Sequence, residues 1–131
     1  MNQRQETVRI PVFSNGGPDQ IGITHPTRAD LLSDLAAHLA GPQGFTLATL
    51  NLDHLVKLRR DRDFLSAYQA HSHIVADGNP VVWLSRLAGH QVELIPGSEL
   101  VQPLAALAAQ TGTPVGLLGS TDEVLALTAQ R

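Results

Sequence analysis

The sequence predicts an α/β domain with a Rossmann-like, parallel or mostly parallel sheet that has helices on both faces. Short runs of apolar and β-branched residues alternate along the chain with longer amphipathic stretches. This β-α-β-α order is typical of parallel sheets whose crossover helices cover the faces. The length of 131 residues suits one domain, and no repeat or low-complexity linker divides it. We therefore expect residues 1–131 to form a single α/β domain.

The first expected elements are a weak strand and a well-marked helix. Residues 7–13, TVRIPVF, could form a strand, which Pro11 restricts to an edge or irregular position. A turn rich in glycine and proline follows. Thr27 and Asp30 then form a T-x-x-D capping box ahead of leucines that recur every three to four residues. This spacing predicts an amphipathic helix that ends at the Gly-Pro pair of residues 41–42.

Two short strands and a helical stripe are expected in the middle of the chain. The apolar runs FTLATL, residues 45–50, and IVA, residues 74–76, predict strands. Between them, the sequence LDHLVKLRRDRDFLSAYQAH carries one helical stripe. The stripe consists of Leu55, Leu58, Leu65 and Tyr68. The nearly balanced charge run RRDRD, residues 59–63, is expected to be a solvated helical face.

The last third of the chain predicts three helices and a strand. Asn79 suits an N-cap and Pro80 suits the first helical position, so a helix is expected from there to about residue 89. Trp83 lies inside this helix, where core packing is the expected role of its ring. An alanine- and leucine-rich helix follows, and then TPVGLLGS, residues 113–120, predicts a strand with a glycine turn. The chain continues into a capped helix.

Composition excludes several classes of function. The net charge of −3 gives no global attraction for nucleic acid. The absence of cysteine excludes disulfides and thiolate metal sites, and permits a reducing cytoplasm. The start, MNQRQETVRI, has no signal-peptide h-region, and no window approaches the roughly 20 apolar residues of a membrane span. We therefore expect a cytoplasmic protein. Any contact with a membrane would be peripheral.

Asp77 is unusual because a carboxylate directly ends a short apolar strand. In open α/β sheets, ligands bind outside the carboxyl ends of the strands. Gly78 would let the backbone turn tightly or let a ligand approach, and the following helix offers the positive end of its dipole. A carboxylate there can act as a general base on a hydroxyl or bind a sugar. The alternative is that Asp77 only stabilises the helix start, although Asn79 suits the cap better.

Two other strand ends carry polar residues. Thr49 and Asn51 are two positions apart, so extended backbone projects them to the same side, where hydroxyl and amide groups suit a sugar or phosphate. Asn51 could equally cap the next helix, which is the simpler interpretation. Gly119 and Ser120 could admit a phosphate at a helix N-terminus. The chain has neither G-x-G-x-x-G nor a P-loop lysine, which argues against a nicotinamide-binding domain.

A pair of histidines raises the question of a metal. His71 and His73 are two apart and would face one side of a strand, an arrangement that could suit a metal ion. No third ligand stands at a recognisable spacing from them. We therefore expect no metal site.

Four motifs in order resemble those of the WecG/TagA/CpsF glycosyltransferases, which form glycosyltransferase family 26. They are TLNLDHLVKLRRDRDF, ADGNPVVWLSRLAG, PGSEL and VGLLGS, and they run from about residue 45 to residue 119. Several motifs in order are much more specific than any one of them. Members of this family transfer a sugar, commonly of the N-acetylmannosamine type, from a UDP donor to a polyprenyl-diphosphate-linked sugar. The resemblance implies that reaction here, in bacterial cell-envelope or exopolysaccharide synthesis.

The resemblance also implies a set of site residues. It makes Asp77 the general base for the acceptor hydroxyl. The implied substrate-binding residues are Thr49, Asn51, Gly78, Asn79, Gly97 and Ser98. The family reaction is inverting and metal-independent, and the UDP-sugar is its donor substrate, so no cofactor is implied. In the segment ELIPGSE, this chain has Leu94, Pro96 and Glu99 where the family pattern E-R-V-T-G-S-D has arginine, threonine and aspartate.

Family members continue for roughly another hundred residues. The chain therefore resembles the N-terminal half to two-thirds of their catalytic domain. The later part would complete the UDP pocket and meet the membrane. The implied partners are a UDP-sugar, a lipid-linked acceptor, a membrane surface through that later part, and a second copy of the chain. The alternative is a truncated, non-catalytic α/β module that binds a sugar or a lipid-linked acceptor, or that serves as an assembly partner.

Overall fold

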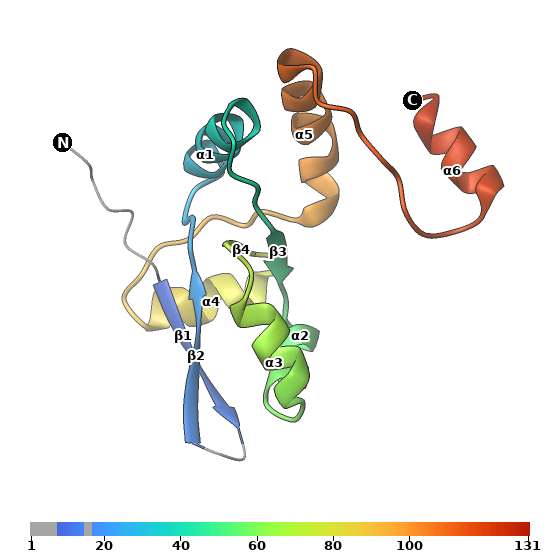
Figure 1. Ribbon diagram of the computed structural model, residues 1–131. Helices are drawn as coiled ribbons and strands as arrows, with labels where there is room; N and C mark the ends of the chain where they lie inside the picture. The colour runs from blue at the N-terminus through green and yellow to red at the C-terminus, as the bar shows by residue number, and fades with distance from the viewer. Residues whose placement is uncertain (1–7, 15–16) are drawn as a thin grey trace.

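The computed structural model describes residues 8–14 and 17–131, and Figure 1 shows how its helices and strands are arranged. The strands are β1 (Val8–Ser14), β2 (Gly17–Ile23), β3 (Leu47–Leu50) and β4 (His73–Ala76). The helices are α1 (Arg28–Ala40), α2 (Leu52–Leu58), α3 (Arg62–Gln69), α4 (Asn79–Leu87), α5 (Gly97–Thr111) and α6 (Asp122–Ala129).

The parallel pair of β3 and β4 lies at the centre of the fold. Its register runs from Leu47 opposite His73 to Leu50 opposite Ala76. The other edge of β4 is also hydrogen-bonded, because the backbone N–H of Thr24 donates to the carbonyl of Ile74 at 2.9 Å. Further along the same edge, the N–H of Ile95 donates to the carbonyl of Ala76 at 2.8 Å. Both edges of this short strand are therefore covered by other backbone.

Alternate residues of the parallel pair pack into two separate core clusters, because successive side chains of a strand point to opposite faces. One cluster packs against helices α2, α3 and α4 and against β2. Its buried members are Ile21, Ile23, Leu50, Leu55, Leu58, Leu65, Tyr68, Ile74, Ala76, Val81, Val82 and Val92. The other packs against α1 and α5 and consists of Leu31, Leu35, Val75, Ile95 and Leu100. The predicted Rossmann-like α/β class with helices on both faces is confirmed.

The first helix is as predicted, whereas the second predicted helical stripe is divided between two helices. Thr27 Oγ1 accepts from the backbone N–H of Asp30 at 3.2 Å, so the predicted N-cap forms, and the Asp30 carboxylate accepts from the Thr27 hydroxyl at 2.7 Å. The stripe of four buried side chains is also present. Its helix is interrupted because Asp61, within the exposed charge run, caps α3 by accepting from the N–H of Phe64 at 2.9 Å.

Two details of α4 differ from the prediction. The N-cap is Gly78 rather than Asn79, and Asn79 is already helical. The reason is the backbone at Gly78, whose φ of 107° makes the turn that starts the helix. Trp83 is 58% exposed, so its predicted core position is wrong. The helix instead buries the face that carries Val81, Val82 and Ser85.

Two strand assignments also need correction. The stretch expected as a turn after β1 forms β2, because it pairs antiparallel with β1 from Val8 opposite Ile23 to Ser14 opposite Gly17. The first residue of the predicted strand, Thr7, lies outside the described residues. The predicted strand at 113–120 is not formed, because no described strand lies beside this segment to pair with it.

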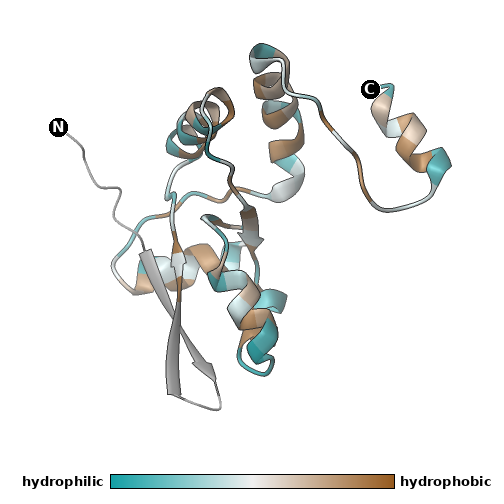
Figure 2. Ribbon diagram, viewed as in Figure 1, coloured by the Kyte–Doolittle hydropathy of each residue, from teal (hydrophilic) through white to brown (hydrophobic). Residues whose placement is uncertain are grey.

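The C-terminal segment lies apart from the two clusters. Figure 1 shows residues 113–121 as an extended connection that carries α6 away from the other elements. Its apolar residues appear brown in Figure 2 and are exposed, with Val115 at 64% and Leu118 fully exposed. Thr121 caps α6 as predicted, but α6 has no buried residue. No helix in the described part of the chain is long and apolar enough to cross a membrane.

Candidate functional site

Asp77 lies at the carboxyl edge of the parallel pair, immediately after β4. Its backbone N–H donates to the carbonyl of Leu50 at 2.8 Å, which fixes it beside the end of β3. The side chain is half-buried. No side chain caps α4, so the carboxylate of Asp77 is not the cap of that helix. Asp77 therefore does not cap α4, whereas stabilisation of the helix start through its dipole stays the alternative to a functional role.

Thr49 lies at the same edge and contacts the start of α5. A Cβ added to Gly97 would lie 3.4 Å from both Thr49 Oγ1 and Thr49 Cγ2. This is ordinary van der Waals contact, so the first residue of α5 packs directly against the Thr49 side chain. The positive end of the α5 dipole is therefore held at the carboxyl edge of the sheet.

Asn51 has the capping role that was the simpler of its two interpretations. Its side-chain oxygen accepts from the backbone N–H of His54 at 2.9 Å, at the N-terminus of α2. The cap uses only the oxygen, so the amide N–H groups of Asn51 remain as donors at this edge. The side chain can thus hold the helix start and still contact a ligand.

The structure brings the predicted site residues to one edge of the sheet. Asn79 and Ser98 are exposed in the first turns of α4 and α5. The seven residues assigned at this edge are Thr49, Asn51, Asp77, Gly78, Asn79, Gly97 and Ser98. The third predicted junction is different, because Gly119 and Ser120 are exposed in the connection before α6, where no strand leads into them.

Two side chains below this edge were missed by the sequence reasoning. The hydroxyl of Tyr68 donates to the carbonyl of Thr49 at 2.9 Å. His54 Nδ1 lies 3.0 Å from that hydroxyl and 3.2 Å from the same carbonyl. Burial and then the negative charge of Asp77 raise the pKa of Tyr68, so its hydroxyl keeps its proton and continues to donate. The helical stripe located the Tyr68 ring, but no sequence signal marked the role of its hydroxyl.

Arg28 supplies a positive charge beside the first turn of α5. Its guanidinium forms an ion pair with Glu99, and its backbone N–H donates to the carboxylate of Glu93 at 2.8 Å. Leu94, which stands at the arginine position of the family pattern, is 40% exposed in the loop between these two glutamates. The cation near this loop therefore comes from α1, far away in the sequence, where no local motif could reveal it.

The pairing of His71 with His73 as neighbours on one strand face is wrong. β4 begins at His73, whereas His71 follows the end of α3 and its Nδ1 lies 2.9 Å from the carbonyl of Ala67. His73 is buried and faces α1 instead. It lies at the amino end of β4, at the opposite end of the strand from Asp77.

The comparison with known protein families gives one match that covers most of the chain. The description of the matching family is glycosyl transferase WecG/TagA/CpsF, and the match spans residues 19–131. This range contains β3, β4 and all the junctions at the carboxyl edge. No solved structure matches the chain. The chain belongs to the WecG/TagA/CpsF family of glycosyl transferases.

Proposed function

We propose that this protein transfers a sugar from a UDP donor to a polyprenyl-diphosphate-linked acceptor, with Asp77 as the general base. The observation that carries the proposal is the carboxylate of Asp77, which follows β4 at the carboxyl edge and does not cap α4. Family membership supports glycosyl transfer in general. The sugar we propose is an N-acetylmannosamine-type or related hexose, used in bacterial cell-envelope or exopolysaccharide synthesis.

The proposed reaction is a single inverting displacement. The acceptor hydroxyl gives its proton to the Asp77 carboxylate while its oxygen forms a bond to the anomeric carbon of the donor sugar. The bond from that carbon to the UDP oxygen breaks at the same time, and UDP leaves with the electron pair. The UDP-sugar is a substrate, so the proposal includes no cofactor.

The surrounding groups have complementary roles in this proposal. The hydroxyl of Thr49 and the free amide N–H groups of Asn51 would hydrogen-bond the sugar. The starts of α4 and α5 present the positive ends of their dipoles, which favour the departing diphosphate. The residues at these starts are Gly78, Asn79, Gly97 and Ser98. Arg28 adds a positive charge near the start of α5, although Glu99 partly neutralises it.

The acceptor determines where the protein would work. A polyprenyl chain resides in the membrane and the nucleotide sugar is in the cytoplasm, so we place the protein at the cytoplasmic face of the membrane as a peripheral protein. An α/β module that binds a sugar or the lipid-linked acceptor without catalysis is the alternative. These two functions differ in donor binding and turnover.

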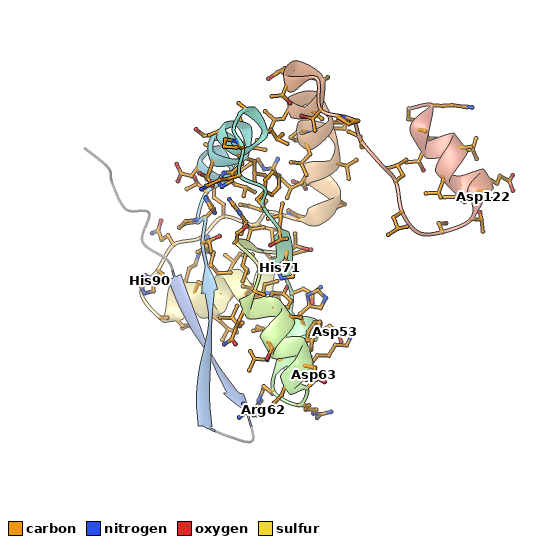
Figure 3. All side chains as sticks on the ribbon, in the orientation of Figure 1. Asp53, Arg62, Asp63, His71, His90 and Asp122 are labelled. Atoms are coloured by element: carbon orange, nitrogen blue, oxygen red, sulfur yellow. The ribbon has the colours of Figure 1, made fainter. Side chains whose placement is uncertain are left out.

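The test is transfer of labelled sugar from UDP-N-acetylmannosamine to a soluble polyprenyl-diphosphate analogue. Asp77→Asn should reduce transfer about 10²- to 10⁴-fold, because the amide keeps the shape but cannot take a proton. Asp122→Asn is the matched control, since Asp122 is an exposed aspartate in the first turn of α6, far from the edge (Figure 3). It should transfer at the parent rate.

Thermal melting of each variant shows whether it is folded. A folded Asp77→Asn protein that transfers sugar at the parent rate would remove Asp77 as the base. A parent protein that binds the acceptor analogue but neither binds nor turns over the UDP-sugar would replace the enzyme by the binding module.

A further inference from the structure

Three ionisable side chains, two of them close in sequence and one remote, meet at the amino end of β4. His73 Nε2 lies 2.6 Å from Asp34 Oδ2, and His25 Nε2 lies 3.3 Å from the same oxygen. Both histidines are buried, whereas the Asp34 side chain is 38% exposed and opens the cluster to solvent. His25 lies in the connection from β2 to α1, Asp34 in α1 and His73 in β4.

The hydrogen bonds around these rings determine where their protons are. His73 Nδ1 lies 2.7 Å from Ser72 Oγ, and the Ser72 hydroxyl donates its one proton to the carbonyl of Thr46 at 3.1 Å. The hydroxyl oxygen can therefore only accept from His73, so Nδ1 carries a proton.

The second ring repeats this arrangement with a different hydroxyl. His25 Nδ1 lies 2.9 Å from Thr24 Oγ1, and the Thr24 hydroxyl donates to the carbonyl of Ile74 at 3.2 Å. Nδ1 of each ring thus donates to a hydroxyl, which leaves Nε2 as the nitrogen available to a metal ion. Metal-binding histidines usually donate from the far nitrogen to a carboxylate, a backbone carbonyl or water, and a hydroxyl takes that place for both rings here.

We propose that His25, Asp34 and His73 bind a divalent transition-metal ion, for which Zn²⁺ is the best match. Two imidazole nitrogens and one carboxylate oxygen form a common zinc ligand set, with water completing the coordination. Without an ion, the Nε2–H of His73 donates to the Asp34 carboxylate, so a proton lies between these two atoms. The ion would replace that proton, so binding releases it to solvent.

The geometry requires a modest rearrangement of the cluster. The three ligand atoms lie within 4.8 Å of one another, whereas ligands of a tetrahedral zinc ion lie about 3.4 Å apart for bonds of about 2.0–2.1 Å. The rings of His25 and His73 are stacked, with centroids 4.8 Å apart and an angle of 10° between their planes. The ligand nitrogens of His25 and His73 must therefore approach each other when the ion binds, whereas the 2.6 Å contact between His73 and Asp34 must open.

The role of this site is to fasten the fold. Asp77 follows the other end of β4, about 13 Å away at roughly 3.3 Å per residue, so the ion does not reach the edge proposed for sugar transfer. Its ligands join β4 to α1 and the connection before α1, where the two other ligands lie at least 39 residues before His73 in the sequence. Metal binding should therefore stabilise the folded chain, because an ion that binds only the native state shifts the unfolding equilibrium.

The first experiment uses the full chain after treatment with EDTA and dialysis. Titration with ZnCl₂ should show one equivalent bound, with proton release that makes the measured heat depend on the buffer, and Tm should rise by several degrees. MgCl₂ should produce neither effect, because Mg²⁺ prefers oxygen ligands. CoCl₂ should give the visible absorption of a four-coordinate cobalt ion.

Variants identify the ligands. His25→Gln and Asp34→Asn should each weaken zinc binding at least tenfold and abolish the Tm rise, whereas His90→Gln should behave like the parent protein. Figure 3 shows His90 beyond the end of α4, away from α1. If one ligand variant does not fold, the other variant and the cobalt spectrum of the parent still decide. Absence of stoichiometric zinc binding, or zinc binding that survives both ligand substitutions, would show that the cluster is not a metal site.

Discussion

The two ends of β4 differ in how their polar side chains are used. At the amino end, His73 is buried between Ser72 and Asp34, and each ring nitrogen has a close partner. At the carboxyl end, the backbone of Asp77 is fixed by Leu50, but its carboxylate does not cap the helix that follows. A four-residue strand thus separates a hydrogen-bonded cluster that includes Asp34 of α1 from the carboxylate that we propose meets a substrate. If Asp77 has the proposed role, hydrogen-bond partners and not residue type distinguish a stabilising polar group from a reactive one.

The largest effect on stability should follow from His73→Ala. The change removes a buried ring and leaves the Ser72 hydroxyl and the Asp34 carboxylate without their partner, which we expect to lower the free energy of unfolding by about 2–3 kcal/mol. Most of this is lost packing and hydrogen bonding, since Asp34 is partly exposed and its charge is screened. Urea denaturation measures the change.

The comparison of the two ends gives this prediction its control. Asp77→Asn should leave the urea midpoint unchanged while it removes transfer, whereas His73→Ala should do the reverse at a temperature where it is folded. Equal losses of stability in both variants would contradict the division of roles along β4.

A smaller effect is expected for Tyr68→Phe. The substitution removes the hydrogen bond to the carbonyl of Thr49, which should lower the free energy of unfolding by about 1 kcal/mol. Because this carbonyl lies at the end of β3, transfer should also fall severalfold with an unchanged pH profile. A variant with full stability and full transfer would show that His54 alone suffices to hold the Thr49 carbonyl.

Acidification of the metal-free protein should weaken the amino end first. Burial, together with the charge of His73, lowers the pKa of His25, although Asp34 and Asp30 oppose this effect. The unfolded chain then binds this proton more readily than the folded chain, so the free energy of unfolding should fall as pH drops below 6.5. The hydrogen bond from His73 lowers the pKa of Asp34, whose contribution is therefore lost in more acidic solution, below 3.8.

Thermal melting in EDTA between pH 7.5 and pH 5 checks the contribution of His25, and a second series to below pH 3.8 checks that of Asp34. His25→Gln should flatten the loss near pH 6, because the group that titrates there is gone. His38 faces the same carboxylate at 3.6 Å and remains in that variant. An equally steep loss in His25→Gln would assign the titration to another group.

The smallest effect is expected for Leu94→Arg. If this position corresponds to the arginine of the family pattern, the new charge should increase the affinity for UDP or another diphosphate up to about fivefold at low salt. The gain should disappear as ionic strength rises, because exposed charges are screened. Unchanged affinity at low salt would remove the loop from the ligand-binding edge.

Local sequence signals predicted the elements that local chemistry determines. The Thr27 N-cap, the short strand before Asp77 and the cap before α6 depend on residues within one turn of each other, and all three are present. Asp77 could be placed at a strand end because aspartate and glycine are both depleted in strands, so the apolar run before them was expected to stop there. That its side chain does not cap α4 could be seen only in the structure.

The errors share a different physical cause, because each depends on a partner elsewhere in the chain. β2 became a strand by pairing with β1 despite its glycine and proline, whereas residues 113–120 met no described strand. Trp83 is apolar, but the rotation of α4 is set by what Val81 and Val82 contact. The Asp34 partner of His73 is equally remote, since it lies 39 residues away in the sequence.

The two core clusters on either face of β3 and β4 have no helix in common. The parallel ladder joins them, together with the loop that carries Val92 and Ile95, so separation of these two strands would expose residues of both clusters. A non-local pairing of this kind forms slowly, because the intervening chain must be ordered before the contacts are gained. Both faces should therefore form in one late cooperative step, while α6, which buries nothing, frays and re-forms on its own timescale.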